Sequence, residues 1–518
     1  MGREQEAWAS FMAWIAWTED TGLQPLAEKN RKKVLAAVDF VTWAGGLRRV
    51  LPSRAGGFRD EGPFEAQESC RAGLPSPAVS RYCHRVSRFR KDRVASAPPP
   101  GEARATRARY GVLCFALAIT AISYLDRVCV SMTAPFIQKD LALSDAQVGY
   151  MFSAFTFAYA VFEIPAGWLA DRFGPRLMMT RVVVWWSLLT AATGLAGGFM
   201  SLFLVRFLFG VGEAGMFPGL SRAFSRWFPE GWRGNAFGLA IMTALIGGAV
   251  TQKVTAELLG TFHWHWRTIF FVYALTGLIW AAAWFWWFRD EPHRHASVNR
   301  AELAVIGTGP PQTHPPVPWR DLLRSRSLIL LCGMYFGIIY GWYFFLTWMP
   351  KYLLKARGFD LQTTGWLAML PLLCMAAGVA GGGRVSDRLI HRLGRRRGRR
   401  LPGLVGLPLA SVLLVVAITT DDAKASALLF AVAAGLATFG VAPGWAACLD
   451  IGGQHAGVVT GAMNTFGNLG GTAMPLLMGL CLNWWGSWQV SLLTVAFFYL
   501  VSAACWLGID PEKPIANT

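Results

Sequence analysis

Long apolar runs alternate with short polar segments from Tyr110 onward, and each run has about the length of a membrane-spanning helix. Six runs come first, at about 110–137, 146–169, 177–197, 199–227, 234–260 and 267–288. Six more follow a polar, proline-rich linker, at about 327–352, 363–386, 401–420, 424–449, 456–482 and 487–508. The pattern predicts an all-α membrane protein with twelve transmembrane helices in two pseudo-symmetric sets of six.

These sets divide the chain into four regions. Residues 1–105 mix Arg, Pro, Gly and Ala, and we expect this N-terminal extension to be largely disordered. Residues 106–288 form the predicted first six-helix bundle, and residues 327–510 form the second. Residues 289–326 are the linker between them, which we expect on the cytoplasmic side.

A charged loop after the second run returns after the eighth. Asp171-Arg172 and Asp387-Arg388 are 216 residues apart, nearly the separation of the first and seventh runs. Equal offsets at two landmarks indicate a parallel internal repeat. An aspartate in such a loop can cap a helix or pair with arginine, so we expect a cytoplasmic latch between the halves. The residues assigned to this latch are Gly167, Asp171, Arg172, Gly174, Arg176, Asp387 and Arg388.

Composition and charge agree with a membrane protein. The chain is 54% hydrophobic and only 15% charged, with a formal net charge of +18. The basic residues lie mostly outside the apolar runs, so they predict orientation rather than nucleic-acid binding. They place both termini of a multi-pass protein in the cytoplasm, on the inner side of a plasma membrane. The nine cysteines and the histidines show no metal-ligand spacing, and we expect no cofactor or metal.

Tyr124-Leu125-Asp126-Arg127 places an acid beside a base inside the first apolar run. Ionisable residues at membrane depth are costly and usually face a bundle interior or a water-filled cavity. One interpretation is an ion pair that ties helices together. The other is a site that handles substrate and protons.

Several motifs carry a family resemblance. The loop GxxxDRxG between the second and third runs, beginning at Gly167, resembles the signature loop of the major facilitator superfamily. A narrower set covers most of residues 110–508: Tyr124-Leu125-Asp126-Arg127, Phe152-Ser153-Ala154-Phe155, Glu163-Ile164-Pro165, Gly212-Glu213-Ala214-Gly215-Met216-Phe217-Pro218, Arg226-Trp227-Phe228-Pro229 and Phe344-Phe345-Leu346-Thr347-Trp348-Met349-Pro350. It resembles the anion:cation symporter family, which includes bacterial galactonate, glucarate and hexuronate permeases and the sialin-type transporters of animals.

This resemblance implies proton-coupled symport of a small organic anion, such as a sugar acid, through a bilayer-embedded protein. By resemblance the substrate-binding residues are Tyr124, Arg127, Tyr159, Arg206, Trp445 and Asn464, with Arg127 on the substrate carboxylate. Asp126 and Glu213 match the two acids implicated in proton coupling. Ala244 stands where galactonate-type members carry glutamine, which implies different hydroxyl contacts.

Helical geometry adds directions. Arg206 and Glu213 are seven residues apart and share one face of the fourth helix. Asp126 and Arg127 are about 100° apart around the first helix, so both cannot point into one cavity. We predict Arg127 toward the substrate and Asp126 toward a neighbouring helix, near Arg206. Glu163 stands close to Pro165, and a structural role is favoured there over coupling.

Asn464 and Asn468 share a face of the eleventh helix. They either hydrogen-bond substrate hydroxyls or hold helices together. An exporter or uniporter of a different solute on the same scaffold is the alternative function. No phosphate-cradling loop, metal cluster or nucleophile motif supports an enzyme or receptor, and we expect a monomer that binds no nucleic acid.

Overall fold

The computed structural model describes residues 104–307 and 319–513, all within the unit Ser96–Thr518. In these ranges, 11 helices are long and apolar enough to cross a membrane. One of them, α16 (Leu361–Thr419), has 59 residues and a non-helical break at Gly394, with φ +81° and ψ 165°. It therefore contains the predicted eighth and ninth spans, and the prediction of twelve spans is confirmed. The predicted extension 1–105 falls almost wholly outside the described residues.

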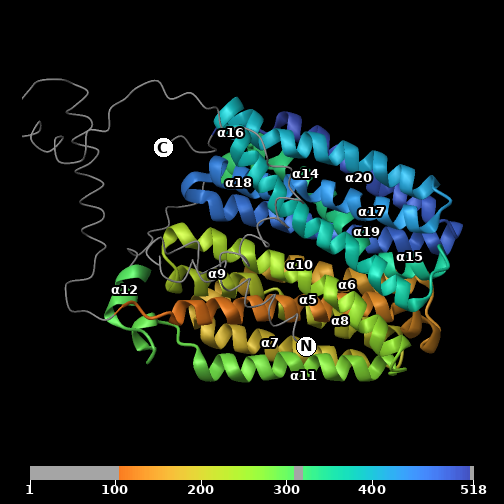
Figure 1. The fold of residues 1–518 in the computed structure, drawn as a ribbon, viewed down its shortest axis with the longest axis horizontal. Helices are drawn as coiled ribbons and strands as arrows, with labels where there is room; N and C mark the ends of the chain where they lie inside the picture. Colours follow the sequence, from red (N-terminus) through yellow and green to blue (C-terminus); the bar gives the residue numbers. More distant parts are fainter. Residues whose placement is uncertain (1–103, 308–318, 514–518) are drawn as a thin grey trace, which may run out of the picture. The chain divides into compact units, whose positions relative to one another are not determined.

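The first half, coloured orange to green in Figure 1, supplies six spans from seven helices. The helices are α5 (Ala108–Asp140), α6 (Asp145–Phe173), α7 (Pro175–Leu195), α8 (Phe199–Glu213), α9 (Met216–Trp227), α10 (Glu230–Gly260) and α11 (Trp266–Trp287). In the linker, η1 (Pro292–Arg294), α12 (Arg300–Ile306) and α13 (Trp319–Arg324) are short helices on either side of the undescribed segment 308–318.

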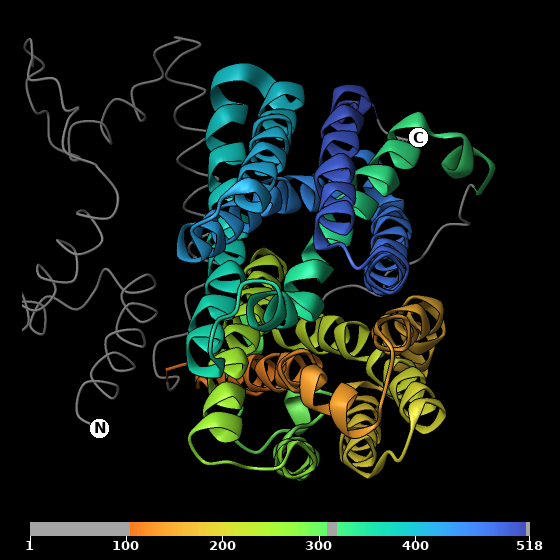
Figure 2. The same ribbon diagram turned by 90° about the vertical axis from the view of Figure 1, so that its right-hand side faces the viewer.

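The second half, coloured green-cyan to blue, forms the other bundle in Figure 2. Its helices after α13 are α14 (Arg326–Tyr343), the π-helical turn η2 (Phe344–Trp348), α15 (Met349–Lys355), α16, α17 (Ala423–Ala437), η3 (Thr438–Gly440), α18 (Val441–Gly452), η4 (Gly453–His455), α19 (Ala456–Trp485) and α20 (Trp488–Gly508). The seventh span is thus α14, η2 and α15 in series.

The internal repeat is visible in how two spans break. The fourth span consists of α8 with 15 residues and α9 with 12, separated at Ala214-Gly215. The tenth span consists of α17 with 15 residues and α18 with 12, separated by η3. Corresponding spans of the two halves are therefore interrupted at the same depth. Glu213 is the last residue of α8, so its carboxyl group lies at the break in the fourth span.

Local sequence explains where the loop after the second span turns. Helix α6 begins with a capping box, in which Ser144 and Gln147 exchange side-chain to backbone hydrogen bonds. It ends at Gly174, whose φ of +76° is a conformation that residues with a Cβ rarely adopt. Pro175 then occupies the first turn of α7, where its missing N–H has no helical partner to lose.

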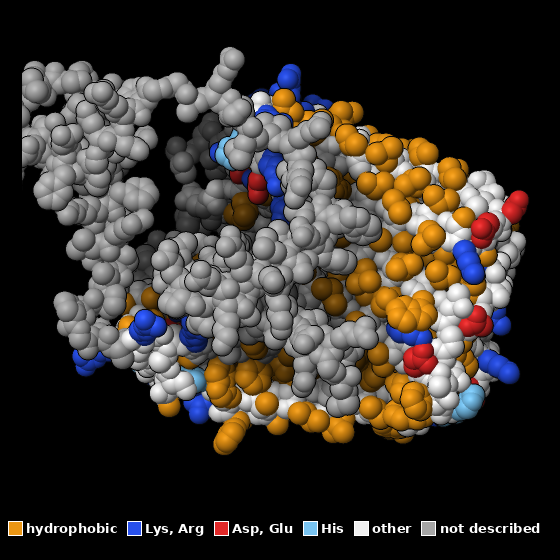
Figure 3. All heavy atoms as spheres, in the orientation of Figure 1, with side chains coloured by type: hydrophobic (Ala, Val, Ile, Leu, Met, Phe, Trp, Pro, Cys, Tyr) orange, Lys and Arg blue, Asp and Glu red, His pale blue; other side chains and the backbone are white. Residues whose placement is uncertain are grey.

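The outer surfaces of the spans are apolar. In the face shown in Figure 3, hydrophobic side chains cover the helices between their ends, and acidic and basic side chains gather at the ends. Large hydrophobic residues such as Ile164, Trp286 and Leu195 are exposed on the described helices. Such a band is the surface that a bilayer requires.

The two halves meet mainly where α6 packs against α19 and α10 packs against α16. Ser153 Oγ of α6 donates a hydrogen bond to Thr472 O of α19 at 2.8 Å. At the end of the molecule where α6 begins, Asp145 also pairs with Lys351 of α15, and Gln362 Nε2 donates to Thr261 Oγ1 at 2.6 Å. This end is closed by contacts between the halves.

Helices α6 and α19 separate toward the other end of the molecule. That end carries the arginines of the repeated loops, and we call it the basic end. A Cβ built on Gly457 or Gly461 of α19 would meet nothing within 4 Å among the described residues. By contrast, one built on Gly149 of α6 would lie 2.7 Å from Pro475 O. The contact between α6 and α19 is therefore tight at the closed end and absent from the first turns of α19.

Close packing inside the second half gives a testable prediction. A Cβ on Gly378 of α16 would lie 2.1 Å from Gly435 O of α17, and backbone cannot move aside as a flexible side chain can. We expect Gly378→Ala to destabilise the protein by about 1–3 kcal/mol, as overpacking does elsewhere. The apparent melting temperature of the purified protein measures this. Gly457→Ala, which adds the same methyl in open space, is the control, and equal melting temperatures would contradict the packing argument.

Candidate functional site

A buried ion pair joins α5 to α8. Arg127 Nε donates a hydrogen bond to Glu213 Oε1 at 2.8 Å. The side chain of Glu213 is fully buried, whereas 9% of the Arg127 side chain remains exposed. Ser123, one turn before Arg127 on the same face of α5, donates a second hydrogen bond to the same carboxylate oxygen. Part of the Arg127 side chain is therefore accessible, whereas the carboxylate with which it pairs is not.

Aromatic rings surround the Arg127 guanidinium. Its central carbon lies 5.4 Å from the Tyr124 ring centroid, 5.1 Å from that of Phe155 and 4.8 Å from that of Tyr159. Tyr343 of α14, in the other half, lies close enough to interact electrostatically with it. Nη2 of Arg127 is buried and makes no hydrogen bond of standard geometry with the described residues, although the Tyr159 hydroxyl lies near the guanidinium. A buried charged donor without a partner is costly, so this group is poised to bind an anion.

Asp126 points in a different direction from Arg127, as adjacent positions on a helix must. Its carboxylate is buried, faces Trp186 and Thr190 of α7, and lies within electrostatic range of Arg206 and Glu213. No hydrogen bond of standard geometry reaches either of its oxygens from the described residues. The two neighbours in the sequence thus do not pair with each other.

The side chain of Arg206, on α8, is more completely buried than that of Arg127. Its guanidinium carbon is 5.2 Å from the Phe155 ring centroid and 4.6 Å from that of Phe209. It is buried and interacts electrostatically with Asp126 and Glu213. Asp126, Arg127, Arg206 and Glu213 together form what we call the central ion cluster, in which two guanidinium groups face two carboxyl groups.

A second polar group connects the halves. Glu163 of α6 accepts hydrogen bonds from Asn464 Nδ2 at 2.6 Å and from Asn468 Nδ2 at 3.3 Å, both on α19. All three residues are partly exposed. The sequence favours a structural role for Glu163 beside Pro165, and it allows either substrate binding or helix pairing for the two asparagines. The structure shows a direct contact between the two halves.

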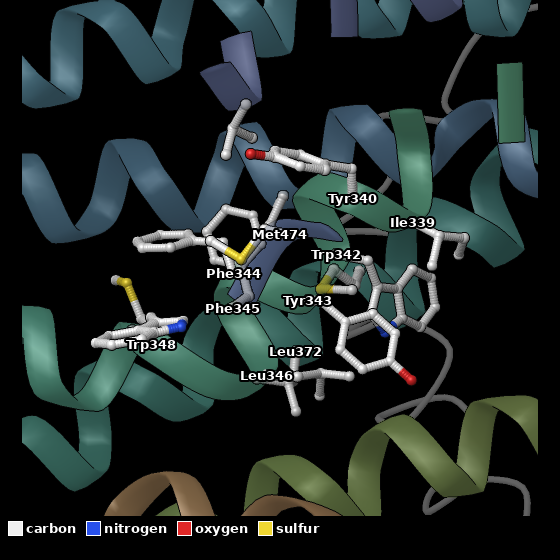
Figure 4. Close-up of a cluster of buried hydrophobic side chains, with 14 of the residues drawn as sticks. Ile339, Tyr340, Trp342, Tyr343, Phe344, Phe345, Leu346, Trp348, Leu372 and Met474 are labelled. Atoms are coloured by element: carbon white, nitrogen blue, oxygen red, sulfur yellow. The ribbon is translucent and has the colours of Figure 1, made fainter. Parts of the chain in front are cut away.

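The second half contributes aromatic residues. Trp445 of α18 donates from Nε1 to the Tyr335 hydroxyl of α14 at 3.1 Å, which fixes the indole. Figure 4 shows the Tyr343 hydroxyl directed away from the packed rings of Phe344 and Phe345. Ala244 of α10, which stands where the resemblance implies a glutamine in galactonate-type proteins, is buried in the apolar core.

Comparison with known proteins identifies the family. The profile of the Major Facilitator Superfamily matches residues 116–475, more than half of the chain. The chain belongs to the Major Facilitator Superfamily.

Related proteins in this superfamily have named cargoes. The chain is 34% identical over 409 residues to a probable sulfoacetate transporter of Cupriavidus necator, covering 77% of this chain and 93% of that protein. It is 35% identical over 425 residues to a probable galactarate/D-glucarate transporter of Bacillus subtilis, covering 77% and 91%. A hexuronate transporter of Bacillus subtilis is 30% identical over 382 residues, covering 73% and 89%. These matches agree with the resemblance to the anion:cation symporters.

A solved structure has the same fold. The crystal structure of a bacterial homologue of the human lysosomal transporter Spinster, in an inward-facing and unoccupied conformation, superimposes with a TM-score of 0.63 at 19% identity. The match covers 80% of this chain and 98% of that one. At this identity the likeness shows the fold alone, which confirms the predicted major facilitator architecture.

The superfamily's signature loop is held within its own half. Arg176 donates from its backbone N to Asp290 Oδ1 at 2.8 Å and from its guanidinium to Phe285 O at 2.9 and 2.6 Å. A Cβ on Gly174 would lie 3.0 Å from Asp290 Oδ1. Gly167 lies beside Pro218 of α9, and Arg172 lies over the Trp168 ring. The side chain of Asp171 is outside the described part of the structure.

The repeated loop is also held within its half. Asp387 accepts a hydrogen bond from Arg399 Nη1 at 3.1 Å, and Asp450 accepts one from Arg399 Nε at 3.0 Å. Arg388 is exposed. The described contacts of the predicted latch residues therefore do not join the halves in this structure, although the latch was predicted to do so in one state of the transport cycle.

Sequence reasoning did not identify three residues that complete the site. Ser123 could have been found from its spacing of four residues from Arg127, which puts both on one face of α5. Tyr343 and Tyr335 carry no local signal, because their relevance depends on where α14 meets the other helices. The structure alone brings them to the charged groups and to Trp445.

Proposed function

We propose that this protein is a proton-coupled symporter of a small organic carboxylate, working by alternating access. The observation that supports it most directly is the Arg127 guanidinium, ringed by aromatic residues and carrying a buried N–H group that makes no hydrogen bond of standard geometry with the described residues. The carboxylate of the substrate would bind there. The named cargoes of the relatives, sulfoacetate, galactarate, glucarate and hexuronate, are all organic anions.

Charge balance supports the coupling to protons. With every member ionised, the central ion cluster is neutral, and adding an anion to a buried neutral cluster leaves a negative charge in a low-dielectric interior. Protonation of Glu213 or Asp126 compensates that charge. Protonation of Glu213 also frees Arg127 from its counterion. Substrate and proton then favour each other's binding, which is the reciprocity that symport requires.

The other assigned residues have supporting roles in this proposal. Tyr124, Tyr159, Trp445 and Asn464 line the substrate, and Arg206 holds Asp126 and Glu213 near one another. The halves, closed at one end by the Asp145–Lys351 pair, rock about the bound substrate while the signature-loop residues exchange partners at the basic end. We further propose a monomer in the bacterial plasma membrane with both termini in the cytoplasm.

Uptake into liposomes containing the purified protein tests the proposal. Hexonates, hexuronates, hexarates and sulfoacetate are supplied outside, with and without an inward proton gradient. Accumulation that depends on the gradient is expected for at least one of them. Efflux, or uptake that ignores the gradient, would instead select an exporter or uniporter on the same scaffold.

A further inference from the structure

Glu163 is a partly exposed acid of α6 that does not belong to the central ion cluster. It lies four residues after Tyr159 on α6, and the Tyr159 ring centroid is 4.8 Å from the Arg127 guanidinium carbon. Four helical residues rise about 6 Å. Glu163 and Arg127 also interact electrostatically. Glu163 therefore lies roughly one helical turn along α6 from Tyr159, the residue whose ring packs on Arg127, and a six-carbon acid spans a distance of that order.

The carboxylate of Glu163 contacts two side-chain amides, one of which, that of Asn464, is assigned to the substrate in the proposed function. Its two carboxylate oxygens accept from Asn464 Nδ2 at 2.6 Å and from Asn468 Nδ2 at 3.3 Å. Burial disfavours the charged form of this carboxylate, whereas the two amide donors and the nearby guanidinium favour it, so it repels a second negative charge at mildly alkaline pH, where it is ionised. A substrate that reaches from Arg127 to Asn464 therefore places its far end beside a negative charge.

We infer that Glu163 makes this protein selective for hydroxylated monoanions over dianions, because its carboxylate accepts hydrogen bonds from substrate hydroxyl groups and repels a second carboxylate at that end. The inference rests on the proposed function and narrows its substrate class. A hexonate would place its carboxylate at Arg127 and its terminal hydroxyl groups at Glu163 and Asn464. A hexarate of the same length would place a second carboxylate there instead. The second carboxylate of the hexarate and the carboxylate of Glu163 carry like charges, and like charges close together in a partly buried site repel strongly.

Equilibrium binding of D-galactonate and D-galactarate to the purified protein, at one mildly alkaline pH, tests this assignment. We expect wild-type protein to bind the hexonate at least about tenfold more tightly than the hexarate, and Glu163→Gln to reduce that ratio to near one. Glu163→Asp keeps the charge and should keep the preference. Glu257→Gln changes a glutamate at the closed end, near Lys253 and Thr261, and should leave the ratio unchanged.

The outcomes separate the two proposals. Equal binding of both acids by wild-type protein, or an unchanged ratio in Glu163→Gln, would overturn the role of Glu163 while leaving organic-anion transport intact. Binding of neither acid, nor of the other organic anions, would overturn the proposed function and this inference with it. If Glu163→Gln does not yield folded protein, Asn468→Lys provides a second test, since an ammonium group beside Glu163 should offset its negative charge and reduce the discrimination. A ratio of binding constants would not change through a purely structural role.

Discussion

Arg127→Met is expected to weaken binding of the organic anion by at least about 100-fold, because removing one partner of a buried charge pair costs 2–5 kcal/mol or more. The change removes the only cation of the central ion cluster whose guanidinium is paired by a direct hydrogen bond within the described contacts. It also leaves Glu213 without its counterion. Binding of the preferred acid to purified protein measures the effect, and uptake into liposomes should be lost in parallel.

Two further variants show whether the loss of binding comes from the charge at position 127 or from replacing any arginine. Arg127→Lys keeps a positive charge but loses the planar fork of donors, so we expect partial binding. Arg392→Met removes an exposed arginine of α16 and should bind as the wild type does. If Arg127→Met binds the anion with unchanged affinity and a normal melting temperature, the carboxylate does not bind at Arg127.

Glu213→Gln should abolish accumulation driven by a proton gradient while preserving exchange of labelled for unlabelled substrate. Glutamine has nearly the same shape, so it can keep contacts with Ser123 and Arg127, but it cannot take up or release a proton. The neutral side chain mimics the protonated acid, in which Arg127 is available to the anion. Parallel measurements of gradient-driven uptake and of counterflow in the same liposomes separate the two activities.

Asp126→Asn is the informative companion to that experiment. Asp126 is the other buried acid of the cluster, and it faces α7 rather than the substrate. If Glu213→Gln accumulates substrate fully and Asp126→Asn does not, the acid that carries the coupling proton is Asp126 rather than Glu213. Accumulation that survives both changes would contradict coupling through the central ion cluster.

The spans could be predicted because their signal is local. A run of apolar residues at each of the twelve positions is enough to define a membrane helix, since the bilayer provides no hydrogen bonds for exposed backbone. The sequence predicts a polar connection for the arginine-rich segment between the eighth and ninth spans, whereas in the structure this segment is helical on both sides of the non-helical break at Gly394. The hydrophobic pattern predicts where the spans lie, but it does not show whether a polar segment between two spans is helical.

The charged residues could be located, but their partners could not. Helical periodicity showed that Asp126 and Arg127 point in different directions, and it put Arg206 and Glu213 on one face of the fourth span. It could not decide that Arg127 pairs with Glu213, which is 86 residues away. The same holds for Glu163 and Asn464, which are 301 residues apart and lie in different halves.

The sequence by itself therefore determined the membrane helices, the internal repeat, the superfamily and the positions of the buried ionisable side chains. Only the tertiary structure decided which of these side chains touch, where the halves are closed, and that the described contacts of the predicted latch residues do not join the halves. The physical reason is that helix formation and burial in lipid depend on neighbouring residues along the chain. Ion pairing instead depends on the rotation and depth of each helix, which packing sets only when all twelve spans are assembled.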